Sequence, residues 1–365
     1  MDLLKQTLNS ITESDKEAIS KAWDYINGLA KPFHSLGKLE EIAANYAGIT
    51  GQVFNKVNKK NIIVMCADNG ICEEGVSSAD QIITKVMTES IPEMRTGVGV
   101  LASFTNSELT VVDIGVKWEI ANPKVINKKV NNGTANMCKG PAMTREEAIK
   151  AIEIGIEITD KLCREGYDLL GTGEMGIGNT STSATVIAAL LGEDVEKLAG
   201  KGTGLTEEQF ENKKRALKKA LEVNKPDRND VIDVLSKVGG FDIAGMCGCF
   251  LSAAKNKKAI VIDGVISCAA ALCAYILKPE CKDYMFTSHK SEEKAVDYVF
   301  KYMGLDPILY LDMRLGEGSG CPLAFNVIEA ALYAVNNMVT FQEMSISIDP
   351  NSSDRTFSLE SEENN

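Results

Sequence analysis

The chain has 365 residues, of which 44% are hydrophobic and 25% charged, and its formal net charge is −12. This composition is typical of a globular protein, and the acidic balance argues against nucleic acid as a partner, because duplex binding requires a basic face. No apolar run approaches the ~20 residues that a membrane-spanning helix requires. The opening segment lacks the basic start and apolar centre of a secretory signal. We therefore expect a cytoplasmic protein that binds neither nucleic acid nor a membrane.

Cysteine and histidine usage bears on redox and metal chemistry. The ten cysteines are scattered and contain no Cys-x-x-Cys pattern, so we expect most of them to be reduced and buried. Only His34 and His289 are present, which leaves a histidine-rich metal site or a Ser-His-Asp triad poorly supported. We expect neither a metal nor a cofactor.

The first part of the chain differs from the rest in its hydrophobic pattern. Residues 1–58 alternate polar and apolar side chains at helical spacing, which predicts two or three helices outside the main sheet. We expect them to form the N-terminal part of a small helical domain.

Beyond this part, short apolar runs that end in Asp, Gly or Ser predict the strands of a large α/β domain over residues 59–343. Helical segments follow most of these runs: Thr144 and Glu147 form a capping box before one, and Ser291 is expected to open another. Strands that alternate with helices predict a parallel sheet, whose ligands bind at the carboxyl ends of the strands. The apolar runs are 61–68, 109–116, 167–170, 258–265, 284–289 and 307–313.

Two stretches lack regular periodicity. Residues 117–143 are long for a connection within a compact domain, which indicates either a functional loop or a simple crossing of the surface. Residues 344–365 are polar and acidic, and we expect this C-terminal tail to be disordered.

A glycine-rich segment, "GTGEMGIGNTSTSA", occupies residues 171–184. Its glycines match the G-x-G-x-x-G fingerprint of dinucleotide-binding proteins, but no second strand ends at an acidic residue about 20 positions further on. Glu174 within the segment would also repel a pyrophosphate. A dinucleotide-dependent oxidoreductase is therefore a disfavoured alternative, and an anion site built from backbone amides is favoured.

A second glycine loop, "GKGTGL" at residues 200–205, precedes a helix that begins at a capping box of Thr206 and Gln209. Lys213 falls on the inward stripe of this helix. A lysine there must reach either an anion or solvent from the helix edge, because an unpaired buried ammonium is costly. Two glycine loops and one inward lysine suit a single phosphate better than a dinucleotide.

A carboxylate lies between two glycines in the segment "LYLDMRLGEGSGCPLAF", residues 309–325. Gly316 and Gly318 allow substrate and backbone to approach Glu317 closely. Glu317 is a candidate general base if burial raises its pKa. The alternative, an exposed glutamate in a turn, is slightly favoured by spacing alone.

Six motifs taken together, in their order along residues ~60 to ~340, resemble the nicotinate-nucleotide–dimethylbenzimidazole phosphoribosyltransferase family. They are "ADNGICEEGVSS", "GTANMCKGPAMT", "GTGEMGIGNTSTSA", "GKGTGL", "FTSHKSEE" and "MRLGEGSG". The resemblance implies an enzyme that transfers 5-phosphoribose from nicotinate mononucleotide to a ring nitrogen of the lower-ligand base of a cobamide. It also implies a Rossmann-like parallel sheet with helices on both faces, a small helical domain and a dimer.

The resemblance assigns roles to residues of this chain. Glu317 matches the catalytic base, and we assign Glu174 as a second carboxylate that stabilises the oxocarbenium-like centre. We expect Leu315, within "MRLGEGSG", to contact substrate. The residues that match positions around the nucleotide are Glu174, Gly176, Ser181, Gly202, Thr203, Gly204, Lys213 and Ser291.

Three segments depart from the family pattern. Asn69 follows Asp68 where the family usually has histidine, Ser78 to Asp80 replace an aromatic–proline pair, and residues 94–102 replace a glycine- and alanine-rich segment. We assign Asp80 to the substrate site, and we expect an acceptor range that includes dimethylbenzimidazole, related bases and phenols. The departures also admit a second class, a non-catalytic partner subunit of a heterodimeric enzyme, against which Glu317, Lys213 and both glycine loops argue.

Overall fold

The structure is a computed structural model, and it describes residues 3–202, 204–348 and 357–359. It divides into a large unit, Met1–Glu13 with Asn58–Phe325, and a small unit, Ser14–Val57 with Asn326–Asn365. The expected small domain began at the N-terminus, whereas α1 (Leu3–Ser10) belongs to the large unit. Leu4 and Thr7 of α1 are buried, and the Leu4 N–H donates to Glu153. In the described part of the chain, no helix has the length and apolar character to cross a membrane.

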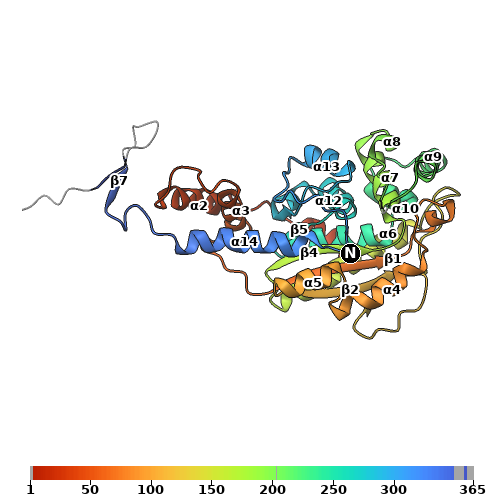
Figure 1. The fold of residues 1–365 in the computed structure, drawn as a ribbon, viewed down its shortest axis with the longest axis horizontal. Coiled ribbons are helices and arrows are strands. Elements are labelled where there is room, and N and C mark those ends of the chain that lie inside the picture. The colour runs from red at the N-terminus through yellow and green to blue at the C-terminus, as the bar shows by residue number, and fades with distance from the viewer. Residues whose placement is uncertain (1–2, 203, 349–356, 360–365) are drawn as a thin grey trace, which may run out of the picture. The chain divides into compact units, whose positions relative to one another are not determined.

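A six-stranded parallel sheet forms the centre of the large unit, in the order β3-β2-β1-β4-β5-β6 (Figure 1). The order reverses between β1 and β4, as in Rossmann-type sheets, which bind ligands at this switch point. The α/β class and the parallel sheet are therefore confirmed. The strands are β1 (Lys60–Ala67), β2 (Glu108–Gly115), β3 (Ile126–Asn127), β4 (Leu169–Met175), β5 (Ala259–Ile262) and β6 (Met285–Thr287).

Helices cover both faces of this sheet. α4 and α5 lie on one face, and α6, α10 and α12 lie on the other (Figure 1). Two of the longest helices, α6 and α9, begin at the predicted capping boxes of Thr144 with Glu147 and of Thr206 with Gln209. The large unit contains α4 (Ile82–Ser90), α5 (Gly97–Phe104), α6 (Arg145–Arg164), α7 (Asn179–Leu191), α8 (Val195–Leu198), α9 (Glu207–Asn224), α10 (Val231–Val238), α11 (Phe241–Lys255), α12 (Val265–Leu277), α13 (Ala295–Met303) and the start of α14 (Gly320–Asn337), with 3-10 turns η1 (Gly70–Glu74), η2 (Ile91–Glu93) and η3 (Pro279–Tyr284).

The small unit contains α2 (Lys16–Gly28), α3 (Lys38–Thr50) and the end of α14. A buried ion pair, Lys31 to Glu40 at 2.8 Å, joins the segment after α2 to α3. Within the C-terminal tail, β7 (Ile346–Ile348) and β8 (Phe357–Leu359) pair as antiparallel strands. The described part of the tail therefore contains regular secondary structure. The rest of the tail lies outside the described residues.

Two sequence predictions about local structure are wrong. Residues 307–313 do not form a strand, because only Leu309 makes a bridge, to His289, and Asp312 has a left-handed φ of 52°. Ser291 does not begin α13; its hydroxyl instead accepts the Glu293 N–H, ahead of that helix.

The glycine segment at 171–184 also lies differently from the prediction. Gly171 and Gly173 are inside β4 and not in the loop after it. A Cβ at Gly171 would lie 2.7 Å from the Cys321 Cβ, and one at Gly173 would lie 2.2 Å from the Glu317 carbonyl oxygen. These glycines therefore allow the start of α14 to approach the sheet closely, which is a packing role and not a dinucleotide fingerprint.

Candidate active site

A cavity of about 280 Å³ opens at the carboxyl edge of the sheet. Its walls come from the segments that follow β4, β5 and β6, from the start of α7 and from the loop before α14. It lies beside the switch point of the strand order, where such folds bind ligands. The lining residues are Val76, Ser77, Ile83, Met87, Glu174 to Thr180, Lys201, Gly202, Leu205, Lys213, Gly264 to Ile266, His289, Ser291, Glu293 and Arg314 to Glu317.

Glu317 is held in this cavity by its backbone and by its side chain. The residue is 7% exposed, and its φ of 61° is left-handed, between Gly316 at 85° and Gly318 at 92°. Its Oε2 accepts the Val98 N–H at 3.0 Å, in the first turn of α5. The positive end of that helix favours a negative charge on Glu317. Glu317 is thus a buried carboxylate facing the cavity and not an exposed turn residue.

Glu174 lies next to Glu317 at the end of β4. Its Oε1 accepts the Glu317 N–H at 3.3 Å, and its Oε2 accepts a hydrogen bond from Asn179 Nδ2. Asn179 Nδ2 also lies 3.4 Å from Asp242 Oδ2. Burial, followed by the charge of Asp242, raises the pKa of Glu174 to about 8. Burial likewise raises the pKa of Asp242 to about 7.

The other end of the cavity collects groups that bind anions. Lys213 is fully buried on α9, as its place on the helix stripe predicted, and its Nζ donates to Thr180 Oγ1 at 2.9 Å. Burial lowers the pKa of Lys213 to about 8, although the charge of Glu293 opposes this shift. The Gly202 N–H donates to Glu293 Oε1 at 3.3 Å. An anion can therefore meet an ammonium and a hydroxyl here, beside a backbone amide that Glu293 occupies.

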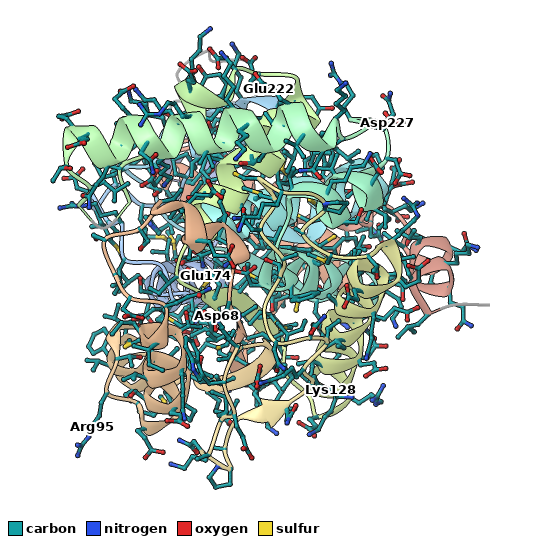
Figure 2. All side chains as sticks on the ribbon, turned by 90° about the vertical axis from the view of Figure 1, so that its right-hand side faces the viewer. Asp68, Arg95, Lys128, Glu174, Glu222 and Asp227 are labelled. Carbon is teal, nitrogen blue, oxygen red and sulfur yellow. The ribbon has the colours of Figure 1, made fainter. Side chains whose placement is uncertain are left out.

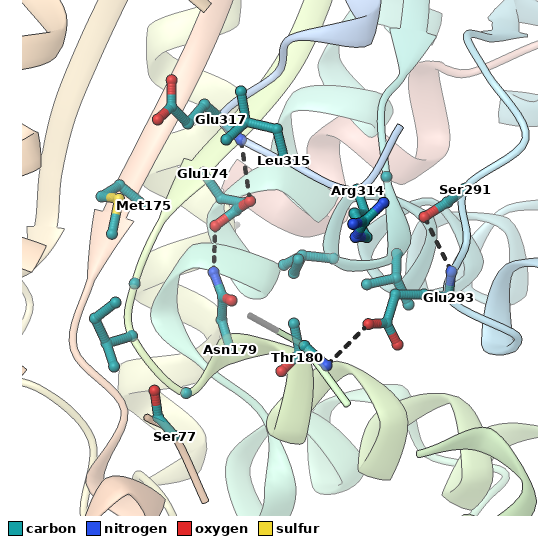
Figure 3. Close-up of a pocket in the computed structure, with 18 of the residues that line it drawn as sticks. Ser77, Glu174, Met175, Asn179, Thr180, Ser291, Glu293, Arg314, Leu315 and Glu317 are labelled. Carbon is teal, nitrogen blue, oxygen red and sulfur yellow. Dashed lines mark hydrogen bonds between the residues drawn. The ribbon is translucent and has the colours of Figure 1, made fainter. Parts of the chain in front are cut away.

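The cavity thus has two chemically different ends (Figure 3). Glu174 and Glu317 lie together at the first, with Leu315 beside them, and Ser291, Glu293 and Arg314 lie at the second. In Figure 2, Glu174 lies among the side chains of the interior, whereas Arg95 and Lys128 point outward. One end suits a cationic or proton-donating group, and the other suits an anion.

Seven of the residues expected from the sequence come together on this cavity: Glu174, Gly176, Gly202, Lys213, Ser291, Leu315 and Glu317. Three others do not line it. Ser181 is fully buried, and Gly204 is exposed with a φ of 101°. The third is Asp80, whose carboxylate accepts the Ile82 N–H at the start of α4. Thr203 lies outside the described residues.

Sequence reasoning missed several residues of the cavity. Thr180 and Asn179 lie within the quoted glycine motif, and their position just after a strand was a usable signal. Glu293 and Arg314 had no such signal, because each is one of many charged residues in polar segments. In the described part of the chain, no three His, Cys, Asp or Glu side chains are grouped as a metal site.

The parallel sheet with its switch point, and a cavity that has a lysine at one end and two carboxylates at the other, define a Rossmann-like α/β protein. A family model described as phosphoribosyltransferase matches residues 11–346. The chain therefore belongs to the nicotinate-nucleotide–dimethylbenzimidazole phosphoribosyltransferase family.

Individual relatives agree with this assignment. A protein of that name from Clostridium tetani is 57% identical, over 95% of this chain and 96% of its own. Another, from Ruminiclostridium cellulolyticum, is 50% identical over 94% and 97%. The crystal structure of the nicotinate-nucleotide–dimethylbenzimidazole phosphoribosyltransferase from Thermus thermophilus superposes with a TM-score of 0.86 at 35% identity, covering 90% of this chain and 98% of that one.

Proposed function

We propose that this protein transfers the 5-phosphoribosyl group of nicotinate mononucleotide to a ring nitrogen of an aromatic base, giving an α-ribotide and nicotinate for cobamide biosynthesis. The observation that carries the proposal is the cavity with two chemically different ends. Lys213 and Thr180 suit the phosphate. Glu174 and Glu317 suit the cationic ring and the incoming base. The curated relatives bear names that state this activity.

The reaction needs one base and good positioning. The acceptor nitrogen attacks C1′ from the face opposite the nicotinate ring, and the C1′–N bond breaks with its electron pair passing to the pyridinium nitrogen. The leaving ring is then neutral and requires no acid. The attacking N–H loses its proton to the Glu317 carboxylate, which faces the cavity. Ionised Glu174 stabilises the positive charge that develops at C1′.

The acceptor would occupy the apolar part of the cavity near Glu317. Leu315, Ile83 and Met87 line it with apolar side chains. Such a wall binds a flat aromatic ring and selects weakly among rings of similar size. We therefore expect dimethylbenzimidazole, related bases and phenols as acceptors. Asp80 does not line the cavity, so we assign it no role in binding the acceptor.

Two further statements belong to the proposal. We expect a homodimer, or a heterodimer with a paralogue, because exposed apolar side chains on α4 and α5 adjoin the cavity through Ile83. We expect a cytoplasmic location, because all ten cysteines are free thiols, which suits a reducing compartment. A non-catalytic subunit is disfavoured, because Glu317 and Lys213 both face the cavity.

The test is to incubate the chain with nicotinate mononucleotide and a panel of benzimidazoles, purines and phenols, and to identify each ribotide by mass. Glu317→Gln keeps the size of the side chain but cannot accept the proton, so turnover is expected to fall by roughly 10²- to 10⁴-fold while nucleotide binding persists. With a phenol that is supplied as its anion, the turnover of the variant should fall much less. Normal turnover of the variant with dimethylbenzimidazole would show that Glu317 is not the base.

A further inference from the structure

Asp263 follows β5 and lies beneath the loop that carries Glu317. The residue is 2% exposed and is not among the described residues that line the cavity. Its Oδ1 accepts the Gly320 N–H at 2.7 Å, and its Oδ2 accepts the Gly318 N–H at 3.1 Å. One carboxylate therefore ties β5 both to the residue after Glu317 and to the first residue of α14.

The loop around Glu317 requires such an anchor. Three successive residues, Gly316 to Gly318, have left-handed φ values, and the middle one is a glutamate, for which that conformation is unfavourable. Flanking glycines are conformationally permissive and do not fix the direction of the side chain between them. The position of the Glu317 carboxylate is then set by whatever holds the backbone on either side.

The neighbouring strand, β4, supplies the other constraints. Glu174 accepts the Glu317 N–H, and the backbone of Gly173 lies against the Glu317 carbonyl, with no space for a Cβ between them. The loop is thus fixed by carboxylates from two adjacent strands. Glu174 also lines the cavity, whereas Asp263 does not and is engaged by the loop and by His289, whose Nδ1 lies 3.9 Å from Oδ1.

We propose that Asp263 is a positioning residue that fixes the Glu317 carboxylate at the acceptor end of the cavity by anchoring the Gly318 and Gly320 amides. This rests on the proposed function, in which Glu317 takes the proton. The anchor requires two acceptor oxygens. An asparagine offers one and would turn an N–H₂ group toward the second amide, which leaves two donors facing each other. Displacement of a catalytic group by about 1 Å costs about 100-fold in rate.

The experiment is a double-mutant cycle. Asp263→Asn is made in the parent protein and in Glu317→Gln, and kcat and KM are measured with nicotinate mononucleotide and dimethylbenzimidazole. In the parent we expect kcat to fall about 100-fold with KM for the nucleotide within about 3-fold. In Glu317→Gln we expect little further loss, because the group that Asp263 positions no longer acts. Equal losses in both backgrounds would overturn the proposal.

A second variant separates positioning from folding. Asp263→Glu keeps both acceptor oxygens one methylene further out, and we expect it to recover part of the activity that Asp263→Asn loses. If neither variant binds nicotinate mononucleotide, Asp263 is a structural residue and the proposal fails. A parent protein without ribotide product would instead refute the proposed function, and a parent that responds to Glu317→Gln but not to Asp263→Asn would refute only this inference.

Discussion

Glu174 and Lys213 face one cavity with pKa values displaced in opposite directions, each to about 8. Burial disfavours the charged form of both, which raises the pKa of a carboxyl and lowers that of an ammonium. In the free protein at pH 7, Lys213 is mostly charged and Glu174 is mostly protonated. A substrate with a cationic ring and an anionic phosphate is bound best when both groups are charged, so binding shifts the proton equilibrium of each.

A pH profile of kcat/KM for the nucleotide is therefore expected to be bell-shaped, with its maximum near pH 8. The ratio falls toward acid because Glu174 becomes neutral, and it falls toward alkali because Lys213 does. Glu174→Gln should remove the acid limb of the profile and should lower kcat/KM overall. Lys213→Arg should remove the alkaline limb, because arginine stays charged throughout this range.

Lys214, the next residue on α9, provides a matched control. It pairs with Glu211 and does not line the cavity. Lys214→Arg should leave the profile unchanged. An alkaline limb that persists in Lys213→Arg would mean that another group titrates there, including the acceptor base itself, which a second acceptor of different pKa would reveal.

The residues of the site differ in how far the sequence could predict them. Lys213 was predictable because helical periodicity alone places it inward on α9. The glycines around Glu317 indicated a close approach. The sequence does not show that the Asp80 carboxylate accepts the Ile82 N–H, because a carboxylate two residues before an amide can either cap it locally or face a ligand. Asp263 was missed because its partners are backbone amides more than fifty positions away.

Among the elements, α6 and α11 approach each other closely enough to bring their backbones into contact. A Cβ at Gly155 would lie 1.9 Å from the Gly245 carbonyl oxygen, and one at Gly248 would lie 1.9 Å from the Ile152 carbonyl oxygen. Neither obstacle is the end of a flexible side chain, so the helices would have to move apart. This pair of helices packs away from the cavity, and none of its residues is part of the cavity lining.

Gly155→Ala is accordingly expected to lower the free energy of unfolding by roughly 1–3 kcal/mol or more, because overpacking a tight core costs this much. The turnover of the folded fraction should stay near that of the parent. Urea denaturation at fixed pH measures the first and active-site titration the second. Gly140→Ala is the control, because nothing lies within 4 Å of a Cβ there. Equal midpoints for the two variants would contradict this account.

At the same scale, the sequence predicted the central strands well and the outer segments poorly. Runs of valine and isoleucine mark β1, β2 and β5, because strands buried on both faces are continuously apolar. The run at 307–313 is also apolar, yet Tyr310 is 71% exposed and the segment makes a single bridge, from Leu309 to His289, which no ladder extends. Apolar composition without a partner does not make a strand. The two-residue strand β3 is too short for any periodicity to reveal it.

In the whole molecule, exposed apolar side chains gather on α4 and α5 of the large unit. Phe104 is 75% exposed, Val100 56% and Val86 49%. Ile83, also exposed, belongs both to this face and to the lining of the cavity. A face of this kind is typical of a subunit interface. A second copy on it would cover the acceptor end of the cavity, so assembly and acceptor binding are expected to be linked.

Sedimentation of the parent chain should therefore give a dimer of about twice 39.5 kDa. Phe104→Asp with Val86→Asp should give a monomer, because two charges on each partner would have to be buried. The monomer should bind nicotinate mononucleotide nearly as well as the parent, since the phosphate end lies away from α5, but its KM for dimethylbenzimidazole should rise at least tenfold. Val223→Asp, at an exposed valine of α9, is the control and should stay dimeric.

Two outcomes would contradict the homodimer on this face. A parent that sediments as a monomer, and dimerises only with a paralogous chain, would establish the heterodimer in place of the homodimer. A Phe104→Asp, Val86→Asp variant that stays dimeric would place the interface elsewhere.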